Sequence, residues 1–328
     1  MKHKQKPIIP VTRKVYSGIN DLPWGDSGKK ITNGCLVLEG GAFRGLYTGG
    51  ALDALMMHGL DLECTIGVSA GAMNGISYAT GQIGYSSRIN LGYRHDPNYV
   101  GVPAFMRNKG IIGFDFAFTA PGDLGPLRLK RIAGYPRRYL AVATSLLTGR
   151  EEYFEAGETP SILQAIRASA SMPYVSWPVT VEGKPYLDGG CACKIPYKWA
   201  LEEGYEKIVI IRTRPRGYRK EIDPEKKHRI TRMLYRKYPE FVKTMLTSDE
   251  DYNRQCEEIE ELEQSGRAYV IYPSGPVNVG RIEKDMEKLG VLYHMGYDDI
   301  EAQLSELRQY LGIRMINQTG AGEQWKRC

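Results

Sequence analysis

The chain has 328 residues, of which 42% are hydrophobic and 25% charged, a composition typical of a globular protein that excludes disorder over most of its length. Lysine and arginine outnumber aspartate and glutamate by 44 to 38, which permits an acidic partner without requiring one. No stretch approaches the roughly 20 apolar residues of a membrane span, and the basic start at Met1–Pro7 lacks the apolar segment of a secretory signal. Because six cysteines in so long a chain do not form a disulfide framework, we expect reduced thiols and a cytoplasmic protein.

The N-terminal part begins with irregular sequence and then alternates between strand and helix patterns. Residues 1–33 carry no sustained apolar period, so we expect an extended arm that precedes the domain. Cys35–Leu38 is a short apolar run typical of a buried strand, and Leu46–His58 has the apolar spacing of a helix. Cys64–Gly67 predicts a second strand, and a second helix follows it. This alternation over about 45 residues indicates a parallel sheet with right-handed crossovers.

Shorter patterns predict the remaining elements. The strands are Tyr139–Ala143, Val179–Val181, Ile208–Arg212 and Tyr269–Tyr272, and the helices are Ser161–Ala168, Tyr197–Glu203 and Asp299–Leu311. Residues 82–135 are rich in glycine, proline and tyrosine, so we expect a long irregular excursion over the sheet. These patterns do not determine the order of the strands.

The last third of the chain carries two blocks of opposite charge. Arg212–Lys237 contains eleven basic residues against three carboxylates, and Asp249–Glu263 contains eight carboxylates against one arginine. One interpretation is a pair of solvated helices whose opposite charges face each other. The other is that the basic block contacts an anionic surface such as a membrane.

A serine flanked by glycines is the first candidate catalytic residue. Gly67-Val68-Ser69-Ala70-Gly71 fits the Gly-x-Ser-x-Gly pattern of a nucleophile elbow, with a predicted strand before it and a predicted helix after it. A serine on such a tight turn needs small neighbours, because the backbone is crowded and the serine adopts a strained conformation. The alternative is a glycine-rich turn in which Ser69 only caps a helix.

Two further motifs fit acyl transfer. Glu39-Gly40-Gly41-Ala42-Phe43-Arg44-Gly45 lies between the first strand and its helix, where backbone N–H groups can stabilise an oxyanion. A nucleotide phosphate loop fits poorly, because neither Gly-x-Gly-x-x-Gly nor Gly-Lys-Ser/Thr is present. Tyr186-Leu-Asp188-Gly-Gly190 supplies a carboxylate before two glycines, although a lone Asp-Gly is also an ordinary turn.

Together and in this order, these motifs resemble those of the patatin-like phospholipases, and bacterial patatin-like proteins in particular, over roughly residues 34–215. That family combines Gly-Gly-x-x-Arg-Gly with Gly-x-Ser-x-Gly and a downstream Asp-Gly-Gly or Asp-Gly-Ala. The resemblance implies an α/β fold, a three-layer sandwich whose mostly parallel central sheet is flanked by helices. Residues 216–328 would be a helical, charged extension packed on the same domain.

The resemblance also implies a function and the residues that perform it. The protein would be a serine-dependent lipid acyl hydrolase, of the phospholipase A, lysophospholipase or carboxylesterase type, acting on a lipid or another acyl ester without a cofactor. Ser69 and Asp188 would form a catalytic dyad within an elbow that includes Gly67 and Gly71. The oxyanion loop would contain Gly40, Gly41, Arg44 and Gly45.

Elementary chemistry sets a condition on this dyad and leaves alternatives open. A free aspartate has a pKa of about 3.9 and is a weaker base than histidine, so Asp188 needs burial that raises its pKa. A Ser-Asp-His triad would add His228 or His294, in the chain order of the α/β hydrolases. A non-catalytic binder of anionic membranes or nucleic acid would use Arg212–Lys237 alone.

Other reactive residue types predict no further site. Cys191 and Cys193 have no second cysteine pair or neighbouring histidine, and the histidines fall in no ligand spacing, so we predict no metal site. No nucleic-acid motif accompanies the basic block, so we expect no nucleic-acid partner, although peripheral contact of Arg212–Lys237 with anionic membrane fits its charge.

Overall fold

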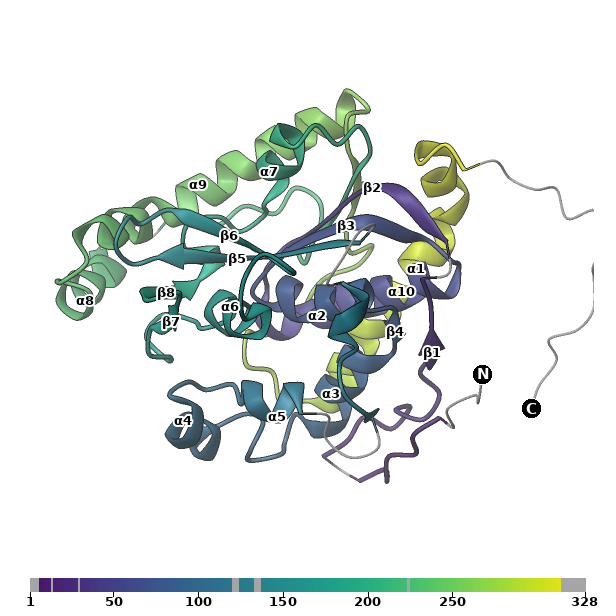
Figure 1. The fold of residues 1–328 in the computed structure, drawn as a ribbon, viewed down its shortest axis with the longest axis horizontal. Helices are drawn as coiled ribbons and strands as arrows, with labels where there is room; N and C mark the ends of the chain where they lie inside the picture. The colour runs from purple at the N-terminus through teal and green to yellow at the C-terminus, as the bar shows by residue number, and fades with distance from the viewer. Residues whose placement is uncertain are drawn as a thin grey trace, which may run out of the picture.

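The computed structural model describes residues 6–12, 14–28, 30–119, 124–132, 137–222 and 225–313, without the side chains of residues 225–228. Within these ranges an eight-stranded sheet forms the centre of the molecule (Figure 1). Its strands are β2 (Ile31–Leu38), β3 (Asp61–Val68), β5 (Arg138–Ser145), β6 (Glu151–Glu155), β7 (Val179–Val181), β8 (Lys184–Asp188), β9 (Ile208–Ile211) and β10 (Tyr269–Ile271). A separate two-stranded sheet joins β1 (Gly25–Asp26) to β4 (Gln82–Ile83).

The strand order is β10-β9-β2-β3-β5-β8-β7, and β6 also pairs with β5. The strands from β10 to β5 in this order are parallel, whereas β6 and β8 pair with β5, and β7 with β8, in antiparallel fashion. The sheet is therefore mostly parallel, as expected.

Helices cover both faces of the sheet because both faces are apolar. Along β2, Leu36 and Leu38 join one buried cluster, whereas Cys35 and Val37 join another. Successive side chains of a strand point to opposite faces, so each face requires its own layer. One layer contains α1 (Gly45–Met57), α2 (Ala70–Ala79), α3 (Tyr85–Tyr93), α6 (Ile162–Ser169) and α10 (Met286–Tyr310), and the other contains α7 (Tyr197–Glu202) and α9 (Pro239–Gln264) (Figure 1). This is the predicted three-layer α/β arrangement.

The predicted strands and helices are all present, but the structure contains further elements that were not predicted. Residues 82–135 contain α3, α4 (Val102–Asn108) and α5 (Phe114–Phe118) where an irregular excursion was expected. The sequence of α3 is polar, so its apolar pattern does not predict a helix. Its Arg88 is nevertheless buried and donates hydrogen bonds to the carbonyls of Ile19 and Leu22. Through these contacts the described part of the N-terminal arm packs on the domain.

The helix α10 begins thirteen residues before the predicted start at Asp299. Gly290 and Gly296, which lie within α10, explain the difference, since glycine lowers the helix propensity of the sequence. A Cβ atom on Gly296 would lie 2.0 Å from the carbonyl oxygen of Tyr47, and one on Gly50 would lie 1.9 Å from that of Tyr293. These glycines therefore allow α10 and α1 to pack with their backbones in close approach.

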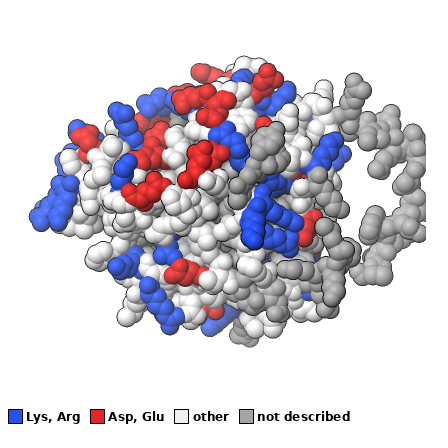
Figure 2. Space-filling view, in the orientation of Figure 1, with Lys and Arg blue, Asp and Glu red and all other residues white. Residues whose placement is uncertain are grey.

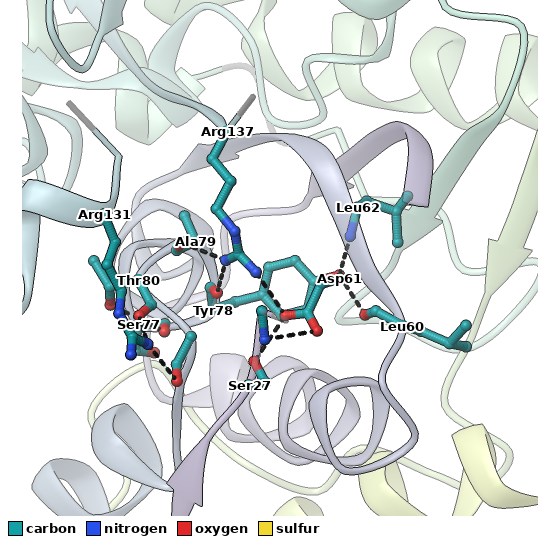
Figure 3. A network of polar contacts seen from close by, with 12 residues as sticks. Ser27, Leu60, Asp61, Leu62, Ser77, Tyr78, Ala79, Thr80, Arg131 and Arg137 are labelled. Carbon is teal, nitrogen blue, oxygen red and sulfur yellow. Dashed lines mark hydrogen bonds and ion pairs between the residues drawn. The ribbon is translucent and has the colours of Figure 1, made fainter. Parts of the chain in front are cut away.

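A polar network holds the carboxyl end of α2 (Figure 3). Arg137 donates to the carbonyl of Ala79 and pairs with Asp61 at an Nη2–Oδ1 distance of 2.9 Å. Arg131 donates to the carbonyl of Thr80 at 2.9 Å. Cationic donors satisfy the free carbonyls at a helix end and interact favourably with its dipole. The network thus fixes the end of α2 that is farthest from Ser69.

The two charge blocks face each other as one interpretation predicted, but only part of the basic block is helical. Arg216, Arg219 and Lys220 precede α8 (Glu225–Leu234) and pair with Glu263, Glu260 and Asp249 of α9. Figure 2 shows acidic and basic side chains intermixed over the region of α9, with basic side chains at the α8 end. None of the helices in the described ranges is both long enough and apolar enough to span a membrane.

Candidate active site

Ser69 occupies the turn between β3 and α2 in a conformation that few serines adopt. Its φ is 55° and its ψ is −120°, a strained combination for a residue with a side chain. A Cβ atom on Gly67 would lie 2.5 Å from the carbonyl carbon of Gly71, and one on Gly71 would lie 2.5 Å from the oxygen of Leu38. Both glycines of the motif are therefore required by close backbone packing.

The register of β5 brings Asp188 to this turn. Val142 of β5 pairs with Val68, the residue before Ser69, and the next residue, Ala143, pairs with Asp188. The Ser69 hydroxyl donates a hydrogen bond to Asp188 Oδ2 at an Oγ–Oδ2 distance of 2.7 Å. The structure thus brings together two predicted residues that are 119 positions apart.

Asp188 has the environment that a base requires. Its carboxylate is buried, and burial raises its pKa to about 6, against the opposing effect of the hydrogen bond from Ser69. Its second oxygen, Oδ1, accepts a hydrogen bond from the Gly190 N–H at 2.8 Å. The Asp188 carboxylate can therefore accept a proton near neutral pH while it stays oriented toward Ser69.

The predicted oxyanion loop lies beside Ser69, but three of its four predicted residues use their N–H groups within the protein. The N–H of Gly40 donates to Lys194, that of Arg44 to Gly41, and that of Gly45 to Ala42. Within the described ranges, no acceptor is paired with the N–H of Gly41 or Ala42.

Ala42 was not among the predicted residues of this loop. It adopts a φ of 50°, which is uncommon for a residue other than glycine, and it lines a cavity together with Ser69 and Gly41. Ala42 is the first residue of the short helical turn 42–44, so its N–H has no partner within that turn. No sequence motif signals this feature, because an alanine carries no preference for a positive φ.

Two cavities meet at Ser69 and differ in character. One, of about 50 Å³, has an apolar lining that includes Phe43, Leu46, Met73 and Ile112. The other, of about 350 Å³, is bordered by Asp188 and by several arginine and lysine side chains. An ester carbonyl placed at Ser69 could therefore extend an apolar chain to one side and a polar group to the other.

The described histidines lie elsewhere. The ring of His294 lies 6.0 Å from that of Tyr16 and 5.2 Å from that of Tyr293, between centroids, and His294 lines neither cavity at Ser69. The side chain of His228 lies outside the described part of the structure. Among the described side chains, no histidine forms a hydrogen bond with Asp188.

The basic block is less available to a membrane than its sequence suggested. Arg212 is buried and pairs with Glu39 at an Nε–Oε2 distance of 3.0 Å, so it cannot contact an anionic surface. Arg216, Arg219 and Lys220 are paired with α9, as described above. Arg216 is exposed although it is paired, and the other exposed arginines of the block are Arg229, Arg232 and Arg236.

Comparison with known proteins places this site in a family. The family described as Patatin-like phospholipase matches residues 36–201, and a Domain of unknown function (DUF6363) matches residues 238–312. The chain is 31% identical over 185 residues to "Uncharacterized protein YjjU" of Escherichia coli (strain K12), across 55% of this chain and 52% of that protein.

Two other similarities are weaker. The "Uncharacterized NTE family protein Rv1063c" of Mycobacterium tuberculosis is 30% identical over 162 residues, across 49% of this chain and 43% of that protein. The chain thus matches about half of the length of these curated relatives. The crystal structure of VipD from Legionella pneumophila aligns with a TM-score of 0.47 and 16% identity, across 95% of this chain and 73% of that chain.

Proposed function

Because the chain belongs to the patatin-like phospholipase family, we propose that it is a lipid acyl hydrolase in which Ser69 is the nucleophile and Asp188 the general base. The observation that carries the proposal is the 2.7 Å hydrogen bond between Ser69 Oγ and Asp188 Oδ2. It joins the strained serine of a nucleophile elbow to a buried carboxylate whose pKa is raised to about 6.

The reaction follows from the direction of this hydrogen bond. Asp188 accepts the hydroxyl proton as Ser69 Oγ forms a bond to the ester carbonyl carbon, and the carbonyl oxygen becomes an oxyanion. When the oxyanion collapses, the C–O bond to the alcohol breaks, and Asp188 returns the proton to the leaving alcohol oxygen. A water molecule then attacks the acyl-serine, gives its proton to Asp188 and releases the fatty acid as Ser69 regains a proton.

The oxyanion must be stabilised by donors that are free in the resting protein. The N–H groups of Gly41 and Ala42 meet this condition among the described residues and border the cavity at Ser69. Their fixed orientation matters because one donor in such a hole is typically worth about 3–4 kcal/mol. In this proposal Gly40 and Gly45 shape the loop through their own hydrogen bonds, and their N–H groups do not contact the oxyanion.

We also propose that one edge of the molecule contacts an anionic lipid surface. The edge consists of α4, residues 174–177 and α8, and we call it the α4–α8 edge. Trp177 N–H donates to the Lys109 carbonyl after α4, and Tyr174, which borders the large cavity, hydrogen-bonds Thr231 of α8. The edge therefore forms one border of the site's entrance.

Exposed apolar and basic side chains support this contact. Met106, Trp177 and Met233 are 78%, 63% and 66% exposed along the α4–α8 edge. Exposed apolar groups of this size on a protein surface mark sites of interaction. The exposed arginines of α8 and the turn after it lie on the same edge, and basic residues near an anionic bilayer contribute about 1 kcal/mol each.

Covalent labelling tests the proposed nucleophile. A fluorophosphonate should label the native protein at Ser69, and Ser69→Ala should lose both labelling and hydrolysis of a soluble ester while its thermal unfolding remains cooperative. The matched control is Ser265→Ala, which removes a hydroxyl on the exposed end of α9 and should keep both properties. Labelling of Ser69→Ala at another serine would contradict the assignment.

A further inference from the structure

The larger cavity beside Ser69 has an excess of positive charge in its lining. The basic lining residues are Arg44, Lys194, Arg214, Lys220 and Arg281, and the acidic ones are Glu39, Asp188 and Asp249. Two of these carboxylates are already balanced by ion pairs, Glu39 with Arg212 and Asp249 with Lys220.

The charges of Glu39 and Asp249 are therefore balanced by residues other than Arg44, Arg214 and Arg281. Glu39 Oε2 accepts hydrogen bonds from Arg212 and from the Thr213 N–H, at 3.0 and 2.6 Å, and its Oε1 accepts one from Tyr252 at 2.8 Å. Asp249 Oδ1 pairs with Lys220 Nζ at 2.5 Å, and Asp188 Oδ2 accepts the hydrogen bond from the Ser69 hydroxyl.

Arg44 is the buried member of the cluster. Its residue is 9% exposed, and its Nε has no hydrogen-bond partner in the described part of the chain. Burial, with the nearby charge of Arg214 second, lowers the pKa of Arg44 to about 10, so the guanidinium remains charged at neutral pH. Glu39 supplies an opposing charge, but its oxygens are already bonded to Arg212, Thr213 and Tyr252, so an anion beside Arg44 would offset the cost of burying the guanidinium.

Arg214 and Arg281 complete the cluster from two other segments. Arg214 is half-buried, and its guanidinium carbon lies 4.4 Å from the centroid of the Tyr218 ring, which fixes the side chain at the cavity. Arg281 is exposed and borders both cavities at Ser69, so it lies where an ester substrate would change from its apolar part to its polar part.

We propose that Arg44, Arg214 and Arg281 bind the anionic phosphate group of an acyl ester substrate whose carbonyl lies at Ser69, an inference that rests on the proposed function. The planar guanidinium matches phosphate oxygens with two parallel donors, which a lysine cannot provide. The acyl chain then occupies the apolar cavity on the other side of Ser69.

This subsite depends on parts of the chain beyond the family match. Arg214 and Arg281 follow residue 201, where the match to the patatin-like phospholipases ends, and Arg281 lies in the region that matches DUF6363. The C-terminal region would therefore supply specificity for a phosphorylated substrate, while the N-terminal region supplies the reacting groups.

Paired substrates test the proposal. The kcat/KM of the native protein is measured on a 1-acylglycerol 3-phosphate and on the 1-acylglycerol with the same chain, both below their critical micelle concentrations. Arg214→Gln and Arg281→Gln should each lower kcat/KM on the phosphorylated ester by at least tenfold and change it on the acylglycerol by less than threefold. Arg216→Gln, a neighbouring arginine that pairs with Glu263, should leave both values unchanged.

Several outcomes would overturn the subsite. If the arginine variants lost kcat/KM equally on both substrates, the arginines would have only a structural role. If the variants kept the native kcat/KM on both substrates, the arginines would not recognise the phosphate. An acyl ester that carries carboxylate groups of the same total charge in place of the phosphate, and that reacts as well, would show that the arginines recognise only negative charge.

A binding measurement separates this inference from the proposed function. Glycerol 3-phosphate and inorganic phosphate are titrated calorimetrically into Ser69→Ala and into Ser69→Ala with Arg214→Gln. If neither ester is hydrolysed, the proposed hydrolase function fails, yet binding that disappears with Arg214→Gln would still support the subsite. If neither ligand bound to Ser69→Ala while the native protein hydrolysed both esters at equal rates, the proposed subsite would be contradicted and the hydrolase function would stand.

Discussion

Glu39 and Arg212 form a buried ion pair directly beneath the loop that precedes α1. Glu39 is the last residue before Gly40, and its N–H donates to the Ile211 carbonyl at 3.2 Å, so the pair joins the ends of β2 and β9. Both side chains are almost fully excluded from solvent. The pair therefore anchors the loop to the sheet beside the larger cavity, which Glu39 lines together with Ser69.

Removing the charge of Glu39 should destabilise the protein and disturb the loop. Glu39→Gln leaves Arg212 buried without its counter-ion, for which we expect a loss of about 3–5 kcal/mol in the free energy of unfolding. Urea denaturation measures this loss. The control is Glu263→Gln, whose partner Arg216 is exposed, and it should lower stability by less than about 1 kcal/mol. Similar losses in both variants would show that the buried pair does not anchor the loop.

Asp188→Asn should abolish hydrolysis, whereas His294→Ala should not. Without a carboxylate, Ser69 has no proton acceptor, and losses of several orders of magnitude in kcat are usual for such a change. His294 packs between Tyr16 and Tyr293, so its removal should alter kcat by less than about threefold. His228→Ala is assayed beside it on the same soluble ester. If either histidine variant were as inactive as Asp188→Asn, a triad would replace the dyad.

The pH dependence of hydrolysis should follow the ionisation of Asp188. Its raised pKa predicts that kcat/KM on a soluble ester is constant above pH 7 and decreases about tenfold per pH unit well below pH 6, as the base becomes protonated. A rate that stayed constant down to pH 4.5 would exclude Asp188 as the base.

The same ionisation should make the active site a source of instability. Asp188 binds a proton more tightly when folded than when unfolded, so its ionised form lowers the free energy of unfolding above pH 6. Asp188→Asn should therefore be more stable than the native protein by about 1–3 kcal/mol at pH 8. Thermal unfolding should show this gain shrinking as the pH falls from 6 toward 4, and it should vanish only below the unfolded pKa of about 3.9, where Asp188 is neutral in both states. A gain that did not vary with pH would have another cause.

Neutralising the exposed arginines of the α4–α8 edge should weaken binding to anionic vesicles. Replacing Arg229, Arg232 and Arg236 together by glutamine should lower the partition coefficient on vesicles containing phosphatidylserine by about 100-fold at low salt, at about 1 kcal/mol per residue. Sedimentation with vesicles measures it, and hydrolysis of a soluble ester should not change. The control variant removes the same charge elsewhere, at Arg254, Arg267 and Lys288. Equal binding by the two triple variants would show that the edge does not dock.

The sequence predicts the reacting part of the site better than its recognition part. Ser69 and its glycines form a local motif, because the strained turn restricts which residues can stand at each position. Arg214 and Arg281 carry no motif and come together only through the sheet and the segment before α10. Ala42 was missed for a related reason, since its N–H is free only because of the backbone conformation that the structure gives it.

The fold was likewise predicted in one part and missed in another. The apolar strands of the parallel sheet were predicted because burial on both faces leaves continuous hydrophobic runs. The strand β6 was missed because three of its five residues are glutamates and Phe154 is its one buried residue. The start of α10 was missed because Gly290 and Gly296 resemble helix breakers until their contacts with Tyr16 and Tyr47 are known.

The position of β9 has a consequence for how the chain can be divided. β9 lies between β2 and β10 in the sheet, and α10 covers α1 through the contact at Gly50 and Gly296. A fragment that ended at residue 201 would leave one edge of β2 without hydrogen-bond partners and one face of α1 in water. Unpaired strand edges and exposed apolar faces promote aggregation, so the motif-bearing half is not an independent folding unit.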